Sequence, residues 1–409
     1  MATIAIGRCL PVFTRSQILS CVRVTGTIVP NRNYNGVGEL ETEIDDPVFS
    51  KLKRGKGGRS SFNGIVATVF GATGFLARHL INKLGKQGTQ IIVPYRGDSY
   101  DVLRLKLTGD LGQVLFVPFN LKDENSIAKA MKYSNVVVNL IGRDFETKNY
   151  TYNNVHVDGA RSIARMASQT GVKKLIHVSS MNVAESAPGV ILNGGSKFLS
   201  SKYLGELAVR EEFPDATIIR PAEIFGQGDR YLRYYASVYR KEGSFIPMWN
   251  KGEGIFKQPV FVSDVAKGIV NAIFDKTAVG RTYQGIGPRL YELRDLIEWY
   301  YKLMRKDKEN YYYIVNMKYI PSFRLRVSFV NKFAPSMPTL IWDKMEREHT
   351  TDEIDPFLPT LVDLGVNPTL LEDQAPWELR PYRAYNYYQP ELGEFPDPEP
   401  PKYVDPYAL

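Results

Sequence analysis

Short apolar runs recur through the middle of the chain and alternate with amphipathic stretches. The runs that we expect to form strands are residues 65–70, 90–95, 114–117, 136–140, 175–178 and 217–219. Helical patterns lie between them, for example at residues 126–131 and 157–170. Strands that are nearly all apolar and alternate with helices are typical of a parallel sheet covered on both faces. The pattern therefore predicts an α/β fold with a doubly wound parallel sheet.

A glycine-rich loop follows the first predicted strand and opens a helix that we expect to run to about Gly85. Gly71 permits a tight turn, and Gly74 lets the backbone approach a pyrophosphate at the positive end of that helix. This is the position of a Rossmann-type nucleotide-binding loop, and vestigial packing is the alternative interpretation. The candidate contacts are Gly71, Ala72, Thr73, Gly74, Phe75 and Leu76, with Ala77 in place of a third glycine.

The choice of cofactor is predicted from the end of the second strand. Arg96 is placed to pair with a 2′-phosphate, which favours NADPH (NADP). Asp98 supports the competing interpretation, NAD, because an acid near this position can bind the ribose hydroxyl. Further residues expected to contact the cofactor follow the third and fourth strands: Asn120 and Leu121 beside the adenine, and Leu140, Ile141 and Gly142 near the cofactor's middle.

The C-terminal half is expected to build a smaller mixed lobe over the cofactor, from residues 222–255 and 291–375. Residues 290–304 have the pattern of an amphipathic helix, and residues 319–344 mix aromatic, aliphatic and basic side chains. That second stretch fits either an ordinary amphipathic core helix or a surface lying on anionic lipid. Residues 376–409 contain eight Pro and six Tyr, which predicts an extended tail, either disordered or wrapped on a partner.

The composition of the N-terminal region indicates where in the cell the protein is located. Residues 1–38 contain four Arg and no acid, which indicates a mitochondrial transit peptide; a disordered basic tail is the alternative. Residues 39–61 form a linker that includes the basic run 51–59. The net charge of +8 is compatible with nucleic acid, but the basic run is short and lacks interleaved aromatics, so we expect none. Neither a transmembrane run nor metal-ligand spacing is present in the sequence.

The chain resembles the extended or atypical branch of the short-chain dehydrogenase/reductase superfamily over roughly residues 62–290. The resemblance rests on the glycine loop, on 177–180, on 198–206, on 259–266 and on 220–226, which contains the cofactor-contact candidate Pro221. It implies that Ser179 or Ser180 and Lys202 occupy the positions of a catalytic Ser and Lys. The position of the catalytic Tyr is Phe198, which has no titratable proton, so the resemblance implies a vestigial site without catalytic residues.

The leader, the basic linker, Arg96 and the missing Tyr together resemble a narrower family, the NADPH-binding accessory subunits of mitochondrial respiratory complex I. That resemblance implies a non-catalytic protein on the matrix side of the inner membrane, near the ubiquinone-binding region, with other complex I subunits as partners and a lipid surface as a further one. It implies a role in assembly and stability. Two hypotheses remain beside it: an active NADPH-dependent reductase or epimerase with an unconventional acid, and a sensor of the NADP(H) ratio.

Overall fold

The computed structural model describes residues 51–186, 189–306, 312–333, 340–385 and 396–404. The predicted transit peptide, residues 1–38, and residues 39–50 of the predicted linker lie outside these ranges. The description below concerns the compact unit formed by Glu41–Leu409. None of the helices in the described ranges has the length and apolar character needed to span a bilayer.

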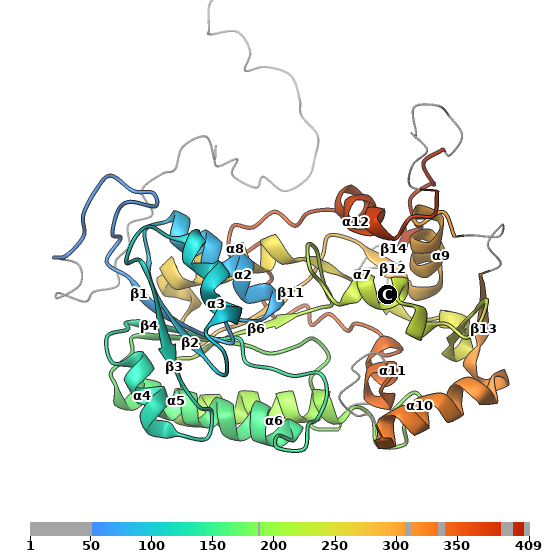
Figure 1. The fold of residues 1–409 in the computed structure, drawn as a ribbon, viewed down its shortest axis with the longest axis horizontal. Helices are drawn as coiled ribbons and strands as arrows, with labels where there is room; N and C mark the ends of the chain where they lie inside the picture. The colour runs from blue at the N-terminus through green and yellow to red at the C-terminus, as the bar shows by residue number, and fades with distance from the viewer. Residues whose placement is uncertain (1–50, 187–188, 307–311, 334–339, 386–395, 405–409) are drawn as a thin grey trace, which may run out of the picture. The chain divides into compact units, whose positions relative to one another are not determined.

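A parallel sheet of seven strands organises the first lobe, in the order β11-β6-β5-β4-β1-β2-β3 (Figure 1). This confirms the predicted α/β, doubly wound sheet, and the structure adds β11, a strand that the apolar pattern did not reveal. The strands are β1 (Val66–Phe70), β2 (Gln90–Tyr95), β3 (Val114–Pro118), β4 (Val136–Asn139), β5 (Lys174–Val178), β6 (Thr217–Pro221) and β11 (Thr282–Gly285).

Helices cover both faces of this sheet because its strands are apolar on both sides. In β4, Val136 and Val138 pack in the cluster that contains α2 and α8, whereas Val137 packs with α4 and α5. Figure 1 shows α2 and α8 on one side and α4, α5 and α6 on the other. The helices are α2 (Phe75–Lys86), α3 (Tyr100–Leu103), α4 (Glu124–Met131), α5 (Gly159–Gln169), α6 (Lys197–Glu212) and α8 (Val262–Phe274).

The second lobe has its own apolar core, drawn from residues 225–255 and 291–379. Its helices are α7 (Tyr231–Ala236), α9 (Leu293–Leu303), α10 (Pro321–Phe333), α11 (Trp342–Glu348) and α12 (Leu371–Leu379). Short strands accompany them: β7 (Ile224–Phe225), β8 (Phe245–Met248), β9 (Phe256–Lys257), β10 (Val260–Phe261), β12 (Leu290–Glu292), β13 (Tyr313–Asn316) and β14 (Tyr403–Val404).

Two boundaries in this lobe differ from the sequence prediction. Residues 290–292 form β12 and not the first turn of the helix, because they pair with β9 and β14. Residues 376–379, predicted to be extended, complete α12 despite Pro376 inside the helix. Ala375 and Leu379 are fully buried there, so packing of the helix outweighs the local disadvantage of proline. Beyond the helix, Tyr403 and Val404 do run extended, as the strand β14.

Candidate functional site

A cleft lies at the carboxyl ends of the sheet strands, where α/β proteins bind ligands. It comprises a cavity of about 550 Å³ and an adjoining one of about 280 Å³. Every predicted cofactor-contact residue except Asn120 lines one or both: Gly71, Ala72, Thr73, Gly74, Phe75, Leu76, Arg96, Leu121, Leu140, Ile141, Gly142, Ser179, Lys202 and Pro221. Ser180 and Phe198 line the larger cavity as well.

The glycine loop has the geometry of an anion cradle. Gly71 has a φ of +80°, and a Cβ there would lie 2.9 Å from the backbone of Leu140. Gly74 caps α2 without a side-chain hydrogen bond, and the first turn of that helix contains no acid. The amides at the start of α2 are therefore available to an anion, and the helix dipole favours one. These residues fit the pyrophosphate of a dinucleotide.

Arg96 lies at the rim of the smaller cavity, just past the end of β2. Its guanidinium carbon is 5.0 Å from the centroid of the Tyr150 ring, and Lys122 Nζ is 4.9 Å from the same centroid. Asp98, the competing candidate, accepts a hydrogen bond of 2.9 Å from Tyr100 N, at the start of α3. The cation is thus presented to the cavity, whereas the acid is occupied in stabilising a helix start.

Asn120 supports this rim and is not part of the cavity wall. Its Oδ1 accepts hydrogen bonds from Lys122 N at 3.1 Å and from Tyr150 OH at 3.4 Å. Tyr150 itself lines the smaller cavity, together with Arg143 and Arg230. The sequence analysis missed these three residues because they come from loops, where no periodicity or motif marks them.

Lys202 lies on α6 and points into the larger cavity. Ser196 caps this helix by accepting a hydrogen bond from Leu199 N, which fixes where the helix begins. Lys202 Nζ donates to Val178 O at 3.1 Å. Burial lowers the pKa of Lys202 to about 8, against the opposing effect of Glu206. The buried Ser179 Oγ has no hydrogen-bond partner among the described residues, so it is available to a ligand.

Two buried histidines support the loop that passes the middle of the cleft. His177 Nδ1 accepts from Asn139 Nδ2 at 3.1 Å, and His156 Nε2 accepts from Arg143 N at 3.1 Å. Burial lowers the pKa of His177 to about 3 and that of His156 to about 2. Both rings are therefore neutral at physiological pH and keep an acceptor nitrogen for these contacts.

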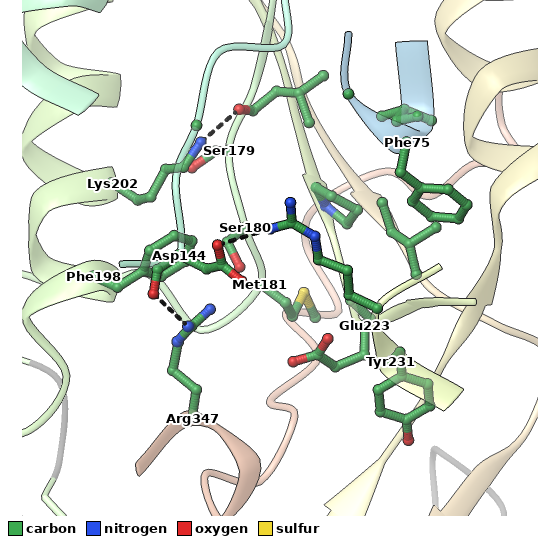
Figure 2. Close-up of a pocket in the computed structure, with 18 of the residues that line it drawn as sticks. Phe75, Asp144, Ser179, Ser180, Met181, Phe198, Lys202, Glu223, Tyr231 and Arg347 are labelled. Atoms are coloured by element: carbon green, nitrogen blue, oxygen red, sulfur yellow. Dashed lines mark hydrogen bonds and ion pairs between the residues drawn. The ribbon is translucent and has the colours of Figure 1, made fainter. Parts of the chain in front are cut away.

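Phe198 stands one helical turn before Lys202 on the same face of α6. Figure 2 shows both side chains projecting from that helix, with Arg347 of α11 next to the Phe198 ring. The guanidinium carbon of Arg347 is 4.1 Å from the centroid of that ring, a cation–π contact. Arg347 Nη2 also donates to Asp144 O at 3.4 Å. A fixed cation therefore covers the side chain that faces the candidate reaction site.

Helix α11 ties the two lobes together through its acidic side chains. Asp343 Oδ1 accepts from Ser196 Oγ at 3.0 Å and from Phe198 N at 3.3 Å, at the start of α6. On the next turn, Glu346 accepts from Ile191 N and Leu192 N, each at 2.8 Å. Glu348, at the end of the helix, pairs inside the second lobe with Arg240 at 3.1 Å.

Asp144 adds a second tie across the cleft, from the loop after β4. Its carboxylate pairs with Arg230 at 3.0 Å, while its carbonyl accepts from Arg347. Burial would raise the pKa of Asp144, but the nearby cations Lys344, Arg230 and Arg347 outweigh burial and lower it. The carboxylate therefore remains ionised in the cleft. Among the described residues, His, Cys, Asp and Glu side chains form no group suited to hold a metal ion.

The fold and the position of the cleft define a class of nucleotide-binding protein. Residues 67–284 match the NAD dependent epimerase/dehydratase family. The fold is also similar to dTDP-glucose 4,6-dehydratase from Streptomyces venezuelae, with a TM-score of 0.57 and 16% identity over 78% of this chain and 97% of that one. A nucleotide cofactor is expected for a member of this family.

Relatives with higher identity define a group inside that class. The chain is 43% identical to NADH dehydrogenase (ubiquinone) 1 alpha subcomplex subunit 9 of Mus musculus, over 84% of this chain and 87% of the relative. It is 35% identical to the NADH-ubiquinone oxidoreductase 40 kDa subunit of Neurospora crassa, over 91% of this chain and 94% of the relative. The chain therefore belongs to the family of these mitochondrial NADH–ubiquinone oxidoreductase subunits, and the resemblance drawn from its sequence is confirmed.

Proposed function

We propose that this protein is a non-catalytic accessory subunit of mitochondrial respiratory complex I that holds NADPH as a structural or sensing ligand. In this role it supports assembly and stability close to the ubiquinone-binding region, on the matrix side of the inner membrane. Its partners are the other subunits of the complex. The kinship with the mouse and Neurospora subunits, each matched along most of its length, supports the assignment to this assembly.

The choice of NADPH is supported by the rim of the smaller cavity. Arg96 and Lys122 flank the Tyr150 ring, so two cations lie where the adenosine end of a dinucleotide would reach on this fold. Arg96 pairs with the 2′-phosphate through charge-assisted hydrogen bonds. Gly71 to Leu76 hold the pyrophosphate, while Ser179, Lys202 and Pro221 flank the nicotinamide end. When bound, NADPH would supply a hydride.

One observation supports the proposal that the protein is non-catalytic: the contact between Phe198 and Arg347. Phe198 has no proton to give, and the guanidinium of Arg347 lies 4.1 Å from the centroid of its ring. A positioned general acid contributes about 10²–10⁴-fold to a rate. Lys202 without that acid serves the cofactor's ribose, and the bound nucleotide stabilises the fold by mass action.

Contact with lipid involves helix α10. Phe323 and Val327 on one side of this helix are fully buried, whereas Leu325, Phe329 and Phe333 on the other are 71%, 63% and 65% exposed. Lys332 Nζ lies 5.5 Å from the centroid of the Phe333 ring. An apolar ridge beside a cation suits the surface of an anionic bilayer, which supports contact between this face of α10 and the inner membrane.

Nucleotide binding to Arg96→Glu tests the cofactor assignment. The variant should lose about 30-fold in affinity for NADPH, the equivalent of a charge-assisted contact of about 2 kcal/mol, and little for NADH. Lys129→Glu on α4, an exposed residue outside both cavities, is the matched control and should bind like wild type. Equal losses for NADPH and NADH would refute the role of Arg96.

Native gel electrophoresis of mitochondrial membranes tests membership of the assembly. The full-length chain should migrate with complex I, and nucleotide extraction from the purified complex should yield NADPH. Recovery of the chain only as a free matrix monomer would contradict the assignment, as would turnover of a carbonyl substrate that is lost in Lys202→Ala.

A further inference from the structure

Four exposed leucines lie along residues 103–115, the segment that leads from α3 into the strand at the outer edge of the sheet in the first lobe. They recur at every fourth position, from α3 through the 3-10 turn that follows it to β3. We call Leu103, Leu107, Leu111 and Leu115 the leucine patch; they are 47%, 81%, 95% and 46% exposed. Tyr100, 78% exposed, precedes them on α3. Val114 packs against Leu105 of the 3-10 turn, so Leu115 lies on the other face of β3 and the exposed leucines flank both faces of this edge. Exposed apolar side chains beside a strand edge suit an interaction site.

The strand beside the leucine patch is an open edge. Strand β3 is the last in the seven-stranded order, and among the described residues it pairs only with β2. Its outward backbone N–H and C=O groups can therefore accept a further strand. Figure 1 shows β3 at the border of the sheet, with α3 beside it. Short edge strands are commonly protected by a partner or a covering element.

The basic run of residues 51–59 borders the same surface. It contains five Lys and Arg residues and no acid, and all of its side chains are exposed. Hydrogen bonds from Leu111 N and from the Ser60 side chain lower the pKa of Asp110, and Arg59 acts in the same direction. These contacts place Arg59, the last residue of the basic run, next to the turn that carries Leu111. The surface thus combines a free strand edge, an apolar patch and a positive border.

We propose that this surface docks a neighbouring protein subunit through an acidic segment that contains apolar residues. The segment adds as an extended strand to the edge of β3, its apolar side chains cover the leucine patch, and its carboxylates face residues 51–59. The open edge favours a polypeptide over a lipid surface, because only a polypeptide can pair with the backbone of β3. This inference rests on the proposed function, since it assigns one interface of the same assembly.

Assembly of the full-length double variant Leu107→Asp/Leu111→Asp tests the interface. Introduced into cells that lack the endogenous protein, this variant should migrate with complex I in an amount reduced about tenfold or more, as expected when central apolar anchors of an interface are lost. Because both side chains are mostly exposed, its thermal stability and its affinity for NADPH should match those of wild type. Assembly at the wild-type level would overturn the proposal.

Two controls separate this inference from the proposed function. Phe357→Asp, an equally exposed site at 93%, should assemble normally; an equal loss there would overturn the specificity of the leucine patch. If the wild-type chain itself fails to migrate with complex I, the proposed function fails and not the interface alone.

A photo-cross-linking amino acid at position 107 identifies the occupant. A cross-link to another complex I subunit, at an acidic segment, would support the proposal. A cross-link to the chain's own residues 1–50, or to lipid, would overturn it. Binding of the wild-type chain to vesicles with 20% anionic phospholipid that the double variant loses would also overturn it and assign this surface to the membrane.

Discussion

The two halves of the cleft are built in different ways. The nucleotide half is made of backbone and small side chains from a single strand–turn–helix segment, Val66–Lys86, with Arg96 close behind it. The reaction half is made of residues from three distant parts of the chain, represented by Asp144, Phe198 and Arg347. The first half keeps open amides, whereas the second, although it lines the larger cavity, is crossed by hydrogen bonds and ion pairs. The difference agrees with the proposed function, in which the first half holds a nucleotide and the second half serves as a joint between the lobes.

The buried pair Arg240–Glu348, which anchors α11 inside the second lobe, gives the largest expected effect. Arg240 and Glu348 are 0% and 3% exposed, and Tyr234 OH also donates to Glu348 at 2.8 Å. Arg240→Met leaves a buried carboxylate without its cation, which should lower the free energy of unfolding by about 3–5 kcal/mol. Denaturant unfolding measures this loss. The affinity of the remaining folded protein for NADPH should stay near that of wild type if the two halves are built independently.

Arg294→Met is the matched control, because Arg294 pairs with Glu298 at the surface, where the side chains are 40% and 44% exposed. This substitution should lower the free energy of unfolding by less than about 1 kcal/mol. Similar losses in the two variants would show that the buried pair stabilises the second lobe no more than a surface pair does.

Gly71→Val probes the other half of the cleft. Gly71 has a positive φ, and a Cβ would lie 2.9 Å from the backbone of Leu140, so the loop must shift. Strain of this kind costs about 1–3 kcal/mol, and the displaced loop should weaken NADPH binding by about 100-fold or more. Isothermal titration calorimetry measures the affinity. Gly112→Val is the control: it has a similar φ of +79° but nothing within 4 Å of its Cβ, so it should be strained yet bind normally.

Acid pH should weaken the fold through His177. Its pKa is about 3 in the folded protein and near 6.5 when unfolded, so below pH 6.5 the unfolded chain takes up a proton that the folded chain does not. Stability from this residue is therefore complete above pH 6.5 and falls towards pH 3. Between pH 6.5 and 5 the loss is about 2 kcal/mol. His177→Asn, which does not titrate, should show a shallower pH dependence in thermal unfolding; an unchanged slope would contradict this account.

The same contrast explains what the sequence could predict. The glycine loop, Arg96 and six of the seven strands follow from local patterns, because a turn, a helix start and an apolar run are each encoded within a few residues. The role of helix α11 does not follow from local patterns. Asp343 contacts Ser196, which lies 147 residues away in the sequence, and no periodicity predicts such a contact. The core of the second lobe also kept 376–379 helical against the preference of Pro376. Tertiary contacts of this kind form the joint between the lobes, so local sequence patterns do not predict it.

Phe198→Tyr gives the smallest expected effect and tests the contrast most directly. In a site that lacked only its acid, restoring the phenol would recover about 10²–10⁴-fold in rate. Here the ring lies against Arg347, which Asp343 holds at 3.3 Å and Asp144 O at 3.4 Å, and α11 fixes the start of α6. The restored hydroxyl therefore meets a held cation and not a substrate. NADPH oxidation with carbonyl substrates should stay at the background rate in Phe198→Tyr and in the double variant with Arg347→Ala, while NADPH affinity is retained. If the single variant turned over, the reaction half would be an intact site missing one proton; if only the double variant did, Arg347 alone would be what closes it.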